Sequence, residues 1–482
     1  MIEYEGRIGL EVHVQLRTNS KMFCGCSTQY GAPPNTQVCP VCLGYPGAMP
    51  MINREAVRLT VTSGLMVGAR INRRSKFDRK SYFYPDMPKN YQISQYDLPL
   101  CEGGAVVFDI DGVEKTVRLA RIHLEEDVAK SFHFAGASGI DFNRAGVPLM
   151  EIVSMPDLST PDEALAYLLA LKELLMYAGV SDCNLEEGNI RCDVNCSVRP
   201  KGGSDLGTKT EIKNLNTFKG VQHALQHELA RQISVLEAGG RIVQETRRWD
   251  MDAGATFSMR TKEDAHDYRY FPEPDLLPVE LDDAVVEQWR AALPETPRAR
   301  RARFRDEYNL PAYDAGVLAA DRDVADFFEA TVRHGASPKA ASNWIMTEML
   351  RRMSEKSAPV SALKITPEAL AGLIGLVDRK TINQATAKEL FDEICDRGGD
   401  PAALARERGL GQISDSAELE QLVGKAMAEN PESVADYRRG KTAAAKFLMG
   451  CIMRMSRGRA DPREAQRILE ERLRIDLPGN AR

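Results

Sequence analysis

The chain has 482 residues, 43% of them hydrophobic and 27% charged, and a net charge of −6. That composition is ordinary for a globular protein with material for about three domains. The negative charge excludes a protein coated throughout with nonspecific nucleic-acid contacts. The sequence has neither an apolar run long enough to cross a bilayer nor a basic signal or transit segment, so we expect a cytoplasmic protein.

Residues 8–16 alternate between apolar and polar side chains, which predicts a β-strand. The apolar side chains would share a buried face, while Glu11, His13 and Gln15 would share the other. A carboxylate and an imidazole on one strand face can together bind a divalent ion. The alternative is a solvated face of an antiparallel sheet, where charged residues alternate in the same way.

Four of the ten cysteines fall within 19 residues: Cys24, Cys26, Cys39 and Cys42. Two close pairs joined by a turn-rich loop can bring four thiolates to one tetrahedral ion, so we predict a structural Zn²⁺ site. Such a closed site has no open position for catalysis, and its expected task is to fix the loop. The alternatives are small buried side chains or a redox pair. The other six cysteines are expected to be buried free thiols.

Residues 76–92 are dense in aromatic and basic side chains among turn residues. They could line a polar groove or form a well-packed irregular loop. Farther along, residues 117–124, 191–198 and 210–215 read as strands, and residues 161–178 and 218–238 read as helices.

Acidic side chains recur on these later strands or at their ends: Glu125, Glu126, Asp193 and Glu211. If the strands belong to one sheet with residues 8–16, their polar faces form an acidic bowl. Hard oxygen ligands favour Mg²⁺, which usually brings substrate phosphates with it. Lys and Arg beside such a metal stabilise phosphoryl transfer. The sequence has no Walker A loop, kinase Gly-rich loop or Rossmann fingerprint, so an ATP site would be built on the sheet.

The composition changes near residue 292, where alternation ends and Ala, Leu, Glu and Arg dominate. We therefore predict a multidomain α+β protein with a mixed domain over residues 1–292, an all-α domain over 293–405 and an all-α tail over 406–482. Residues 438–482 contain twelve basic and five acidic side chains, a net charge of +7, whereas the rest carries −13. This asymmetry suggests a polyanionic partner at the tail, the alternative being a solvated helix surface.

Several long motifs together carry a family resemblance. They are residues 9–16 (Gly-Leu-Glu-Val-His-Val-Gln-Leu), 76–86, 123–127 (His-Leu-Glu-Glu-Asp), 191–195, 213–216, 267–275, 440–441 and 456–462. In this order they resemble the B subunit of the aspartyl/glutamyl-tRNA amidotransferase. The tail departs from the family at residues 451–455, Cys-Ile-Met-Arg-Met, where a Gln and a Lys are more usual.

The resemblance implies a cradle domain related to the glutamine synthetase and guanidino kinase fold. It implies phosphorylation of the side-chain carboxylate of Glu-tRNA(Gln) or Asp-tRNA(Asn) with ATP and Mg²⁺, followed by displacement of phosphate by ammonia. The ammonia would come through a channel from an amidase-type A subunit, and a small C subunit would complete a heterotrimer. The helical domain and tail would hold tRNA.

The resemblance also assigns residues. The metal-site motifs fall on Glu11, His13 and Glu126, with Glu125, Asp193 and Glu211 as further metal or catalytic candidates. Glu126 is one residue out of register with the polar face of its strand, so a strand end or bulge is expected there. The channel motifs fall on Lys80, Lys89, Tyr82 and Tyr84, and a neutral lysine there would need a pKa depressed by burial. The tRNA-binding candidates are Arg438, Arg439, Lys441, Lys446, Arg457 and Arg459.

A rival hypothesis from another class is a non-catalytic, zinc-stabilised tRNA-binding scaffold whose partner does the chemistry. The face that carries Glu11 and His13 discriminates between the two. A stand-alone glutamine-hydrolysing enzyme is disfavoured, since no convincing Cys/His or Ser/Lys nucleophile pair is evident.

Overall fold

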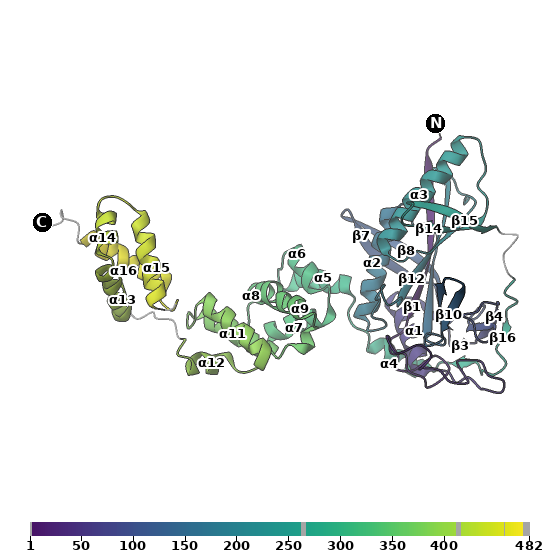
Figure 1. Ribbon diagram of the computed structural model, residues 1–482, viewed down its shortest axis with the longest axis horizontal. Coiled ribbons are helices and arrows are strands. Elements are labelled where there is room, and N and C mark those ends of the chain that lie inside the picture. Colours follow the sequence, from purple (N-terminus) through teal and green to yellow (C-terminus); the bar gives the residue numbers. More distant parts are fainter. Residues whose placement is uncertain (1, 262–266, 411–415, 457, 476–482) are drawn as a thin grey trace. The chain divides into compact units, whose positions relative to one another are not determined.

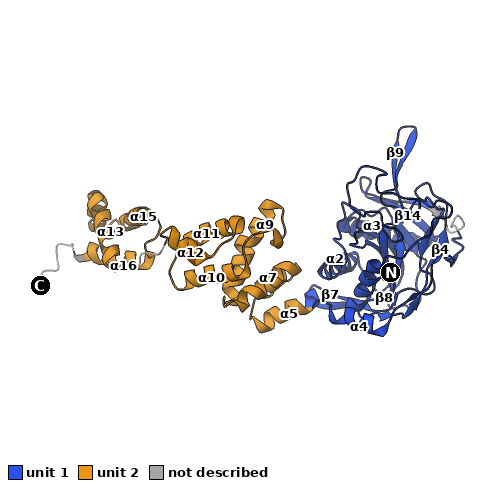
Figure 2. Cartoon of the chain, turned by 90° about the horizontal axis from the view of Figure 1, so that it is seen from below, with its two compact units in different colours: residues 1–298 blue, residues 299–482 orange. Residues whose placement is uncertain are grey.

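The structure, a computed structural model, describes residues 2–261, 267–410, 416–456 and 458–475. The chain divides into two compact units, residues 1–298 and residues 299–482 (Figure 2). The first combines sheets with helices and the second is built of helices, which confirms the predicted order of a mixed α+β part and an α-helical part. None of the helices in the described part of the chain combines the length and the apolar character that a membrane span requires.

A ten-stranded sheet organises the first unit (Figure 1). Its strands are β1 (Tyr4–Gln15), β2 (Arg70–Ile71), β6 (Cys101–Glu102), β7 (Ala105–Ile110), β8 (Val113–Glu126), β11 (Pro148–Ser154), β12 (Ile190–Pro200), β13 (Thr210–Lys213), β14 (Glu245–Asp250) and β15 (Ala255–Thr261). The order is β15-β14-β13-β12-β1-β11-β8-β6-β2, and β7 pairs with β8 off this path. Neighbours are antiparallel except for the parallel pair β13 and β14.

The central strand β1 confirms the alternation seen in the sequence. Its apolar side chains Leu10, Val12 and Val14 are at most 1% exposed and belong to the main core. The polar side chains Glu11 and His13 lie on the opposite face, since successive residues of a strand point to opposite sides. The predicted strands over residues 117–124, 191–198 and 210–215 are present as β8, β12 and β13, within a few residues at their ends.

Helices cover the apolar face of this sheet. They are α1 (Arg54–Met66), α2 (Pro161–Tyr177), α3 (Phe218–Glu237) and α4 (Asp283–Ala291). The two predicted helices are confirmed as α2 and α3, which pack against each other (Figure 1). Each begins at a threonine whose hydroxyl accepts a backbone N–H of the first turn, Thr160 for α2 and Thr217 for α3. Because the helices occupy the apolar face, the polar face of the sheet stays open for a site.

Three small sheets complete the first unit: β16 (Phe271–Pro272) with β4 (Asp78–Ser81) and β5 (Tyr91–Ser94), the hairpin of β9 (Lys130–Phe134) and β10 (Ala137–Asp141), and β17 (Val279–Glu280) with β3 (Arg74–Ser75). The three-stranded sheet carries the aromatic and basic segment singled out in the sequence. Its strand β5 contacts β8 near the acidic end of that strand.

The second unit is a series of helices. They are α5 (Pro297–Glu307), α6 (Ala312–Leu318), α7 (Arg322–Arg333), α8 (Pro338–Trp344), the π-helical turn Ile345–Met349, α9 (Leu350–Lys356), the 3₁₀ turn Val360–Ala362, α10 (Pro367–Asp378), α11 (Gln384–Arg397), α12 (Pro401–Glu407), α13 (Ser416–Glu429), α14 (Pro431–Arg438), α15 (Ala443–Met455) and α16 (Pro462–Ile475). Two apolar cores hold them, one built from residues 304–405 and one from residues 419–473. Leu410 still packs against the first of these cores.

Candidate functional site

The pairing of strands collects charged side chains on the open face of the large sheet. His13 of β1 lies opposite Glu151 of β11, and Glu151 lies opposite His123 of β8. On the other side of β1, Glu11 lies opposite Asp193 of β12. Directly paired residues share a face, so these five side chains form one row across four strands.

Three of these strands bring a histidine and two carboxylates to a common point. Ligand atoms of His13, Glu125 and Glu151 all lie within 4.8 Å of one another. Nε2 of His13 is 3.3 Å from Glu151 Oε2 and 3.9 Å from Glu125 Oε1. Both carboxylates are buried, at 7% and 2% exposure. Two buried carboxylates this close repel each other unless a cation is present, so the donor set suits a divalent ion.

The two histidines of this group interact closely with its carboxylates. Burial lowers the pKa of His13, but the hydrogen bond and charge of Glu151 outweigh this and leave the pKa raised. The pKa of Glu151 is lowered overall, because the nearby charge of His123 and the hydrogen bond from His13 outweigh its burial. His123 Nε2 is 3.5 Å from Glu151, and its buried Nδ1 has no hydrogen-bond partner among the described residues.

The flank of the row on β12 and β13 mixes acids with a cation. Glu11 accepts a hydrogen bond of 2.8 Å from the Asn195 side chain. Burial and the charge of Glu151 raise the pKa of Glu11. The Lys213 ammonium lies 2.7 Å from Asp193 and 3.0 Å from Glu211. These strands therefore do bring the predicted acidic side chains together. The open face of the large sheet carries Glu11, His13, Glu125, Asp193 and Glu211.

Glu126 is the exception, and here the sequence-based assignment needs correction. It is the last residue of β8 and pairs with Pro148, so it points to the face opposite Glu125. Its carboxylate forms an ion pair with Lys89 and accepts the Ile93 N–H at 3.0 Å. The expected strand end is present, but it does not bring Glu126 to His13.

The aromatic and basic segment of residues 76–92 places one lysine near Glu125 and another beside Glu126, on opposite faces of the large sheet. Lys80 lies 5.0 Å from the centre of the Tyr268 ring, and Lys89 lies beside Glu126. Burial lowers the pKa of Lys80, but the charges of Glu125 and neighbouring groups raise it overall, so a neutral amine is not expected there. Tyr82 is half-buried, with its pKa raised by burial, whereas Tyr84 is 56% exposed.

The four clustered cysteines meet as predicted. The sulfur atoms of Cys24, Cys26, Cys39 and Cys42 lie within 4.8 Å of one another. The Cys39–Cys42 separation is 3.9 Å, close to the ~3.8 Å expected between thiolates that bind one Zn²⁺ tetrahedrally. A hydrogen bond from Cys24, with burial opposing it, lowers the pKa of Cys42 to about 4. The group can therefore bind a metal ion.

The remaining cysteines are free. Five of them are buried as expected: Cys101, Cys183, Cys192, Cys196 and Cys395. Cys451 is only half-buried, which corrects the prediction for that residue. It lies on α15, whose inner face is already filled by Leu448 and Ile452.

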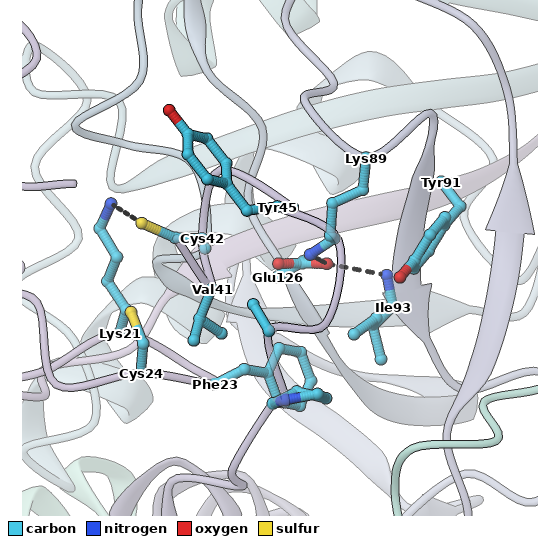
Figure 3. A pocket seen from close by; sticks show the side chains of 14 residues that line it. Lys21, Phe23, Cys24, Val41, Cys42, Tyr45, Lys89, Tyr91, Ile93 and Glu126 are labelled. Atoms are coloured by element: carbon cyan, nitrogen blue, oxygen red, sulfur yellow. Dashed lines mark hydrogen bonds and ion pairs between the residues drawn. The ribbon is translucent and has the colours of Figure 1, made fainter. Parts of the chain in front are cut away.

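A small cavity of about 50 Å³ connects the cysteine group with Glu126. Figure 3 shows Lys21 and Cys42 on one side of it and Lys89 and Glu126 on the other. A much larger cleft of about 1230 Å³ is lined by Gln15, Arg144 and Arg191, among others. Gln15 and Arg191 belong to the open face of the sheet, so this cleft adjoins the acidic bowl.

The basic residues predicted to bind tRNA are spread over the last helices. Lys446 of α15 is exposed, and Arg438 of α14 is exposed too. Arg439 and Lys441 both pair with Asp436. Arg459 donates a hydrogen bond of 3.0 Å to the carbonyl oxygen of Gly409. The prediction for Arg457 lies outside the described residues.

Two residues of the site were missed from the sequence, Glu151 and His123. Glu151 interrupts the apolar run Leu149-Met150-Glu151-Ile152-Val153, and one acid in such a strand is a usable signal. His123 was visible within a family motif. Both residues belong to the site because strand pairing places them in one row with His13, and the sequence does not show which strands pair.

Comparison with known proteins finds relatives that match almost the whole chain. Residues 6–287 match the family model described as the GatB/GatE catalytic domain, and residues 326–473 match the one described as the GatB domain. The aspartyl/glutamyl-tRNA(Asn/Gln) amidotransferase B subunit of Carboxydothermus hydrogenoformans is 50% identical over 478 residues, which cover 98% of this chain and 99% of that one. The protein of the same name from Prosthecochloris aestuarii is 50% identical over 481 residues, covering 100% of both chains. The chain therefore belongs to the family of the aspartyl/glutamyl-tRNA amidotransferase B subunits.

Proposed function

We propose that this chain activates the side-chain carboxylate of Glu-tRNA(Gln), Asp-tRNA(Asn) or both, using ATP and Mg²⁺, and converts it to the amide. The carboxylate oxygen attacks the γ-phosphorus of ATP and ADP leaves. Ammonia then attacks the acyl carbon and phosphate leaves. The first step is needed because a carboxylate is a poor acyl donor, whereas the phosphorylated carboxylate has a good leaving group.

The observation that carries this proposal is the meeting of His13, Glu125 and Glu151 on the open face of the sheet. Two carboxylates dominate this donor set, which suits Mg²⁺, and the imidazole widens it to Mn²⁺. The ion would neutralise phosphate charge during transfer. Glu11 lies in the same row and is a further ligand candidate, whereas Glu126 is left out because it faces away.

Cationic side chains lie on the same open face of the sheet and can stabilise the transferring phosphoryl group. Lys213 lies beside Asp193 and Glu211, and Arg191 lies 2.8 Å from Asp127. The pKa of Lys213 is raised, because its neighbouring carboxylates outweigh burial, so it carries a positive charge. The adjoining cleft of about 1230 Å³ has room for a nucleotide or an aminoacylated tRNA end.

Further parts of the proposal follow from the family. Ammonia would come from an amidase-type A subunit through a channel past Lys80 and Lys89, and a small C subunit would complete the complex. The cradle would be related to the glutamine synthetase and guanidino kinase fold. The four cysteines would hold a structural Zn²⁺, and the basic tail would bind tRNA. The family's names, which describe one component of a tRNA amidotransferase, support a multi-subunit assembly with a tRNA substrate.

The test is a transamidation assay of the assembled complex with charged tRNA, ATP, Mg²⁺ and ammonium chloride, so that glutamine hydrolysis is not needed. We expect Glu151→Gln to reduce ATP-dependent amidation by about 100-fold or more, as loss of a preorganised charged group at a reaction centre does. Glu3→Gln is the matched control, because Glu3 pairs with Lys201 at the exposed surface. Full activity of Glu151→Gln would refute the proposed metal site.

The scaffold hypothesis makes the opposite prediction for the same face. If a partner did the chemistry, His13→Ala would leave amidation intact. Under the proposed function it abolishes amidation, while tRNA binding measured by filter retention persists.

A further inference from the structure

Lys21 is a buried lysine without a carboxylate partner. Its exposure is 0%, and no carboxylate of the described residues forms an ion pair with it. Its Nζ lies 3.3 Å from the carbonyl oxygen of Phe142 and 3.6 Å from the sulfur of Cys42. Its backbone N–H donates to the Cys26 carbonyl at 2.9 Å, so the residue is built into the cysteine loop.

A buried ammonium is tolerated only beside an anion. Of the two groups that Lys21 Nζ contacts, the carbonyl of Phe142 is neutral, so the sulfur of Cys42 is the one that can carry a negative charge. Lys89 shows the contrast within the same cavity, because its ammonium is paired with the Glu126 carboxylate (Figure 3).

A divalent ion held by four thiolates leaves two negative charges uncompensated in a half-buried loop. We propose that Lys21 is the charge-balancing partner of this metal centre, where it donates a hydrogen bond to the Cys42 thiolate. The Cys39 backbone N–H also points to this sulfur, at 3.2 Å. Of these two donors to Cys42, only Lys21 carries a positive charge. The inference rests on the zinc site included in the proposed function.

The experiment measures metal affinity in the purified full-length chain. Zinc content is determined by atomic absorption, and the zinc dissociation constant by competition with a chromogenic chelator. Cobalt substitution reports four-thiolate coordination through its sulfur-to-metal absorption. We expect Lys21→Met to raise the zinc dissociation constant 10- to 100-fold, the usual effect of removing a group that supports a metal ligand.

Two further variants separate charge from other effects. Lys21→Gln keeps a hydrogen-bond donor without the charge and should weaken zinc binding as Lys21→Met does. Lys89→Met removes a lysine from the same cavity that contacts Glu126 and should leave zinc affinity unchanged. Wild-type affinity in Lys21→Gln would overturn the charge-balancing role. So would equal losses in Lys21→Met and Lys89→Met.

A measurement without substitution covers the case in which the Lys21 variants do not fold. A crystal structure of the zinc-loaded wild-type protein should keep the Lys21 ammonium near its 3.6 Å separation from Cys42 sulfur. An ammonium turned away to a carboxylate would overturn the inference. Absence of zinc from the wild-type protein would overturn both the zinc site and the role of Lys21. Zinc that binds equally well without Lys21 would overturn only the latter, and neither result affects ATP-dependent activation.

Discussion

Gly44 links the cysteine loop to Lys89, and substituting it tests how that contact supports the fold. Its φ is +68°, and a Cβ built there would overlap Lys89 Cγ and lie 3.2 Å from Lys89 Cα. An alanine would therefore push Lys89 away from Glu126. Gly47 of the same loop provides a matched control, since it has φ +82° and no atom within 4 Å of its Cβ position.

The expected magnitude follows from two contributions. An alanine in the left-handed region costs about 1 kcal/mol at either position. At Gly44 the ion pair between Lys89 and Glu126 is lost as well, with side chains only 9% and 5% exposed. Leaving a buried charge unpaired costs about 3–5 kcal/mol. The Ile93 N–H still donates a hydrogen bond to Glu126, so we expect the cost of the unpaired carboxylate to lie at the lower end of that range. We expect about 4 kcal/mol for Gly44→Ala and about 1 kcal/mol for Gly47→Ala.

The assay is urea denaturation of the full-length chain, with the free energy of unfolding of the first unit obtained for each variant. A double-mutant cycle adds the Lys89→Ala background, which removes the overlapping Cγ and the ion pair, so Gly44→Ala should lose most of its extra cost over Gly47→Ala. Equal costs for the two glycine variants in the wild-type background would refute the reasoning. A cost of Gly44→Ala that persists undiminished without Lys89 would refute it too.

Two more predictions concern stability and tRNA binding. Glu228 is wholly buried, which by itself would raise the pKa of its carboxyl group, but hydrogen bonds from Arg231 and Gln232 outweigh burial and lower this pKa below 4.5. The ionised carboxylate therefore stabilises the folded state above pH 4.5, and this stabilisation is lost as the pH falls through the lowered pKa. Urea denaturation at several pH values should show Glu228→Gln about 3 kcal/mol less stable at pH 7 and less sensitive to acid, whereas Glu237→Gln on the exposed end of the same helix should match wild type. A chain ending at Leu410 lacks the core of residues 419–473, and its tRNA affinity should be lower and should fall less steeply with salt, because fewer counterions are released. Unchanged affinity and salt slope in a filter-binding titration would count against the tail as a tRNA-binding element.

Local pattern predicted the parts of the fold whose side chains repeat with a clear period. The alternation over residues 8–16 predicted β1 and both of its faces, and the helical pattern over residues 218–238 predicted α3. The spacing of Cys24, Cys26, Cys39 and Cys42 was equally informative, because a short loop limits how far four sulfurs can separate. Each of these features depends on residues close together in the chain.

Glu126 shows where that reasoning stops. Adjacent acids on a strand point to opposite faces, so only one of Glu125 and Glu126 can join His13, and strand pairing decides which. The sequence motif alone favoured Glu126. The charge state of Lys80 was likewise undetermined, because burial and the nearby carboxylates act in opposite directions and their balance depends on distances.

The sequence by itself determined which strands would be amphipathic, which cysteines would cluster, that a helical part follows a mixed one and which family the chain resembles. Only the tertiary structure decided that Glu151 of β11 stands between His13 and His123, that Glu126 belongs to Lys89, and that Lys21 is enclosed beside Cys42. The physical reason is the range of the interactions. Periodicity reports how each segment divides its side chains between two faces, whereas the chemistry of a site depends on which faces meet across strands distant in the chain.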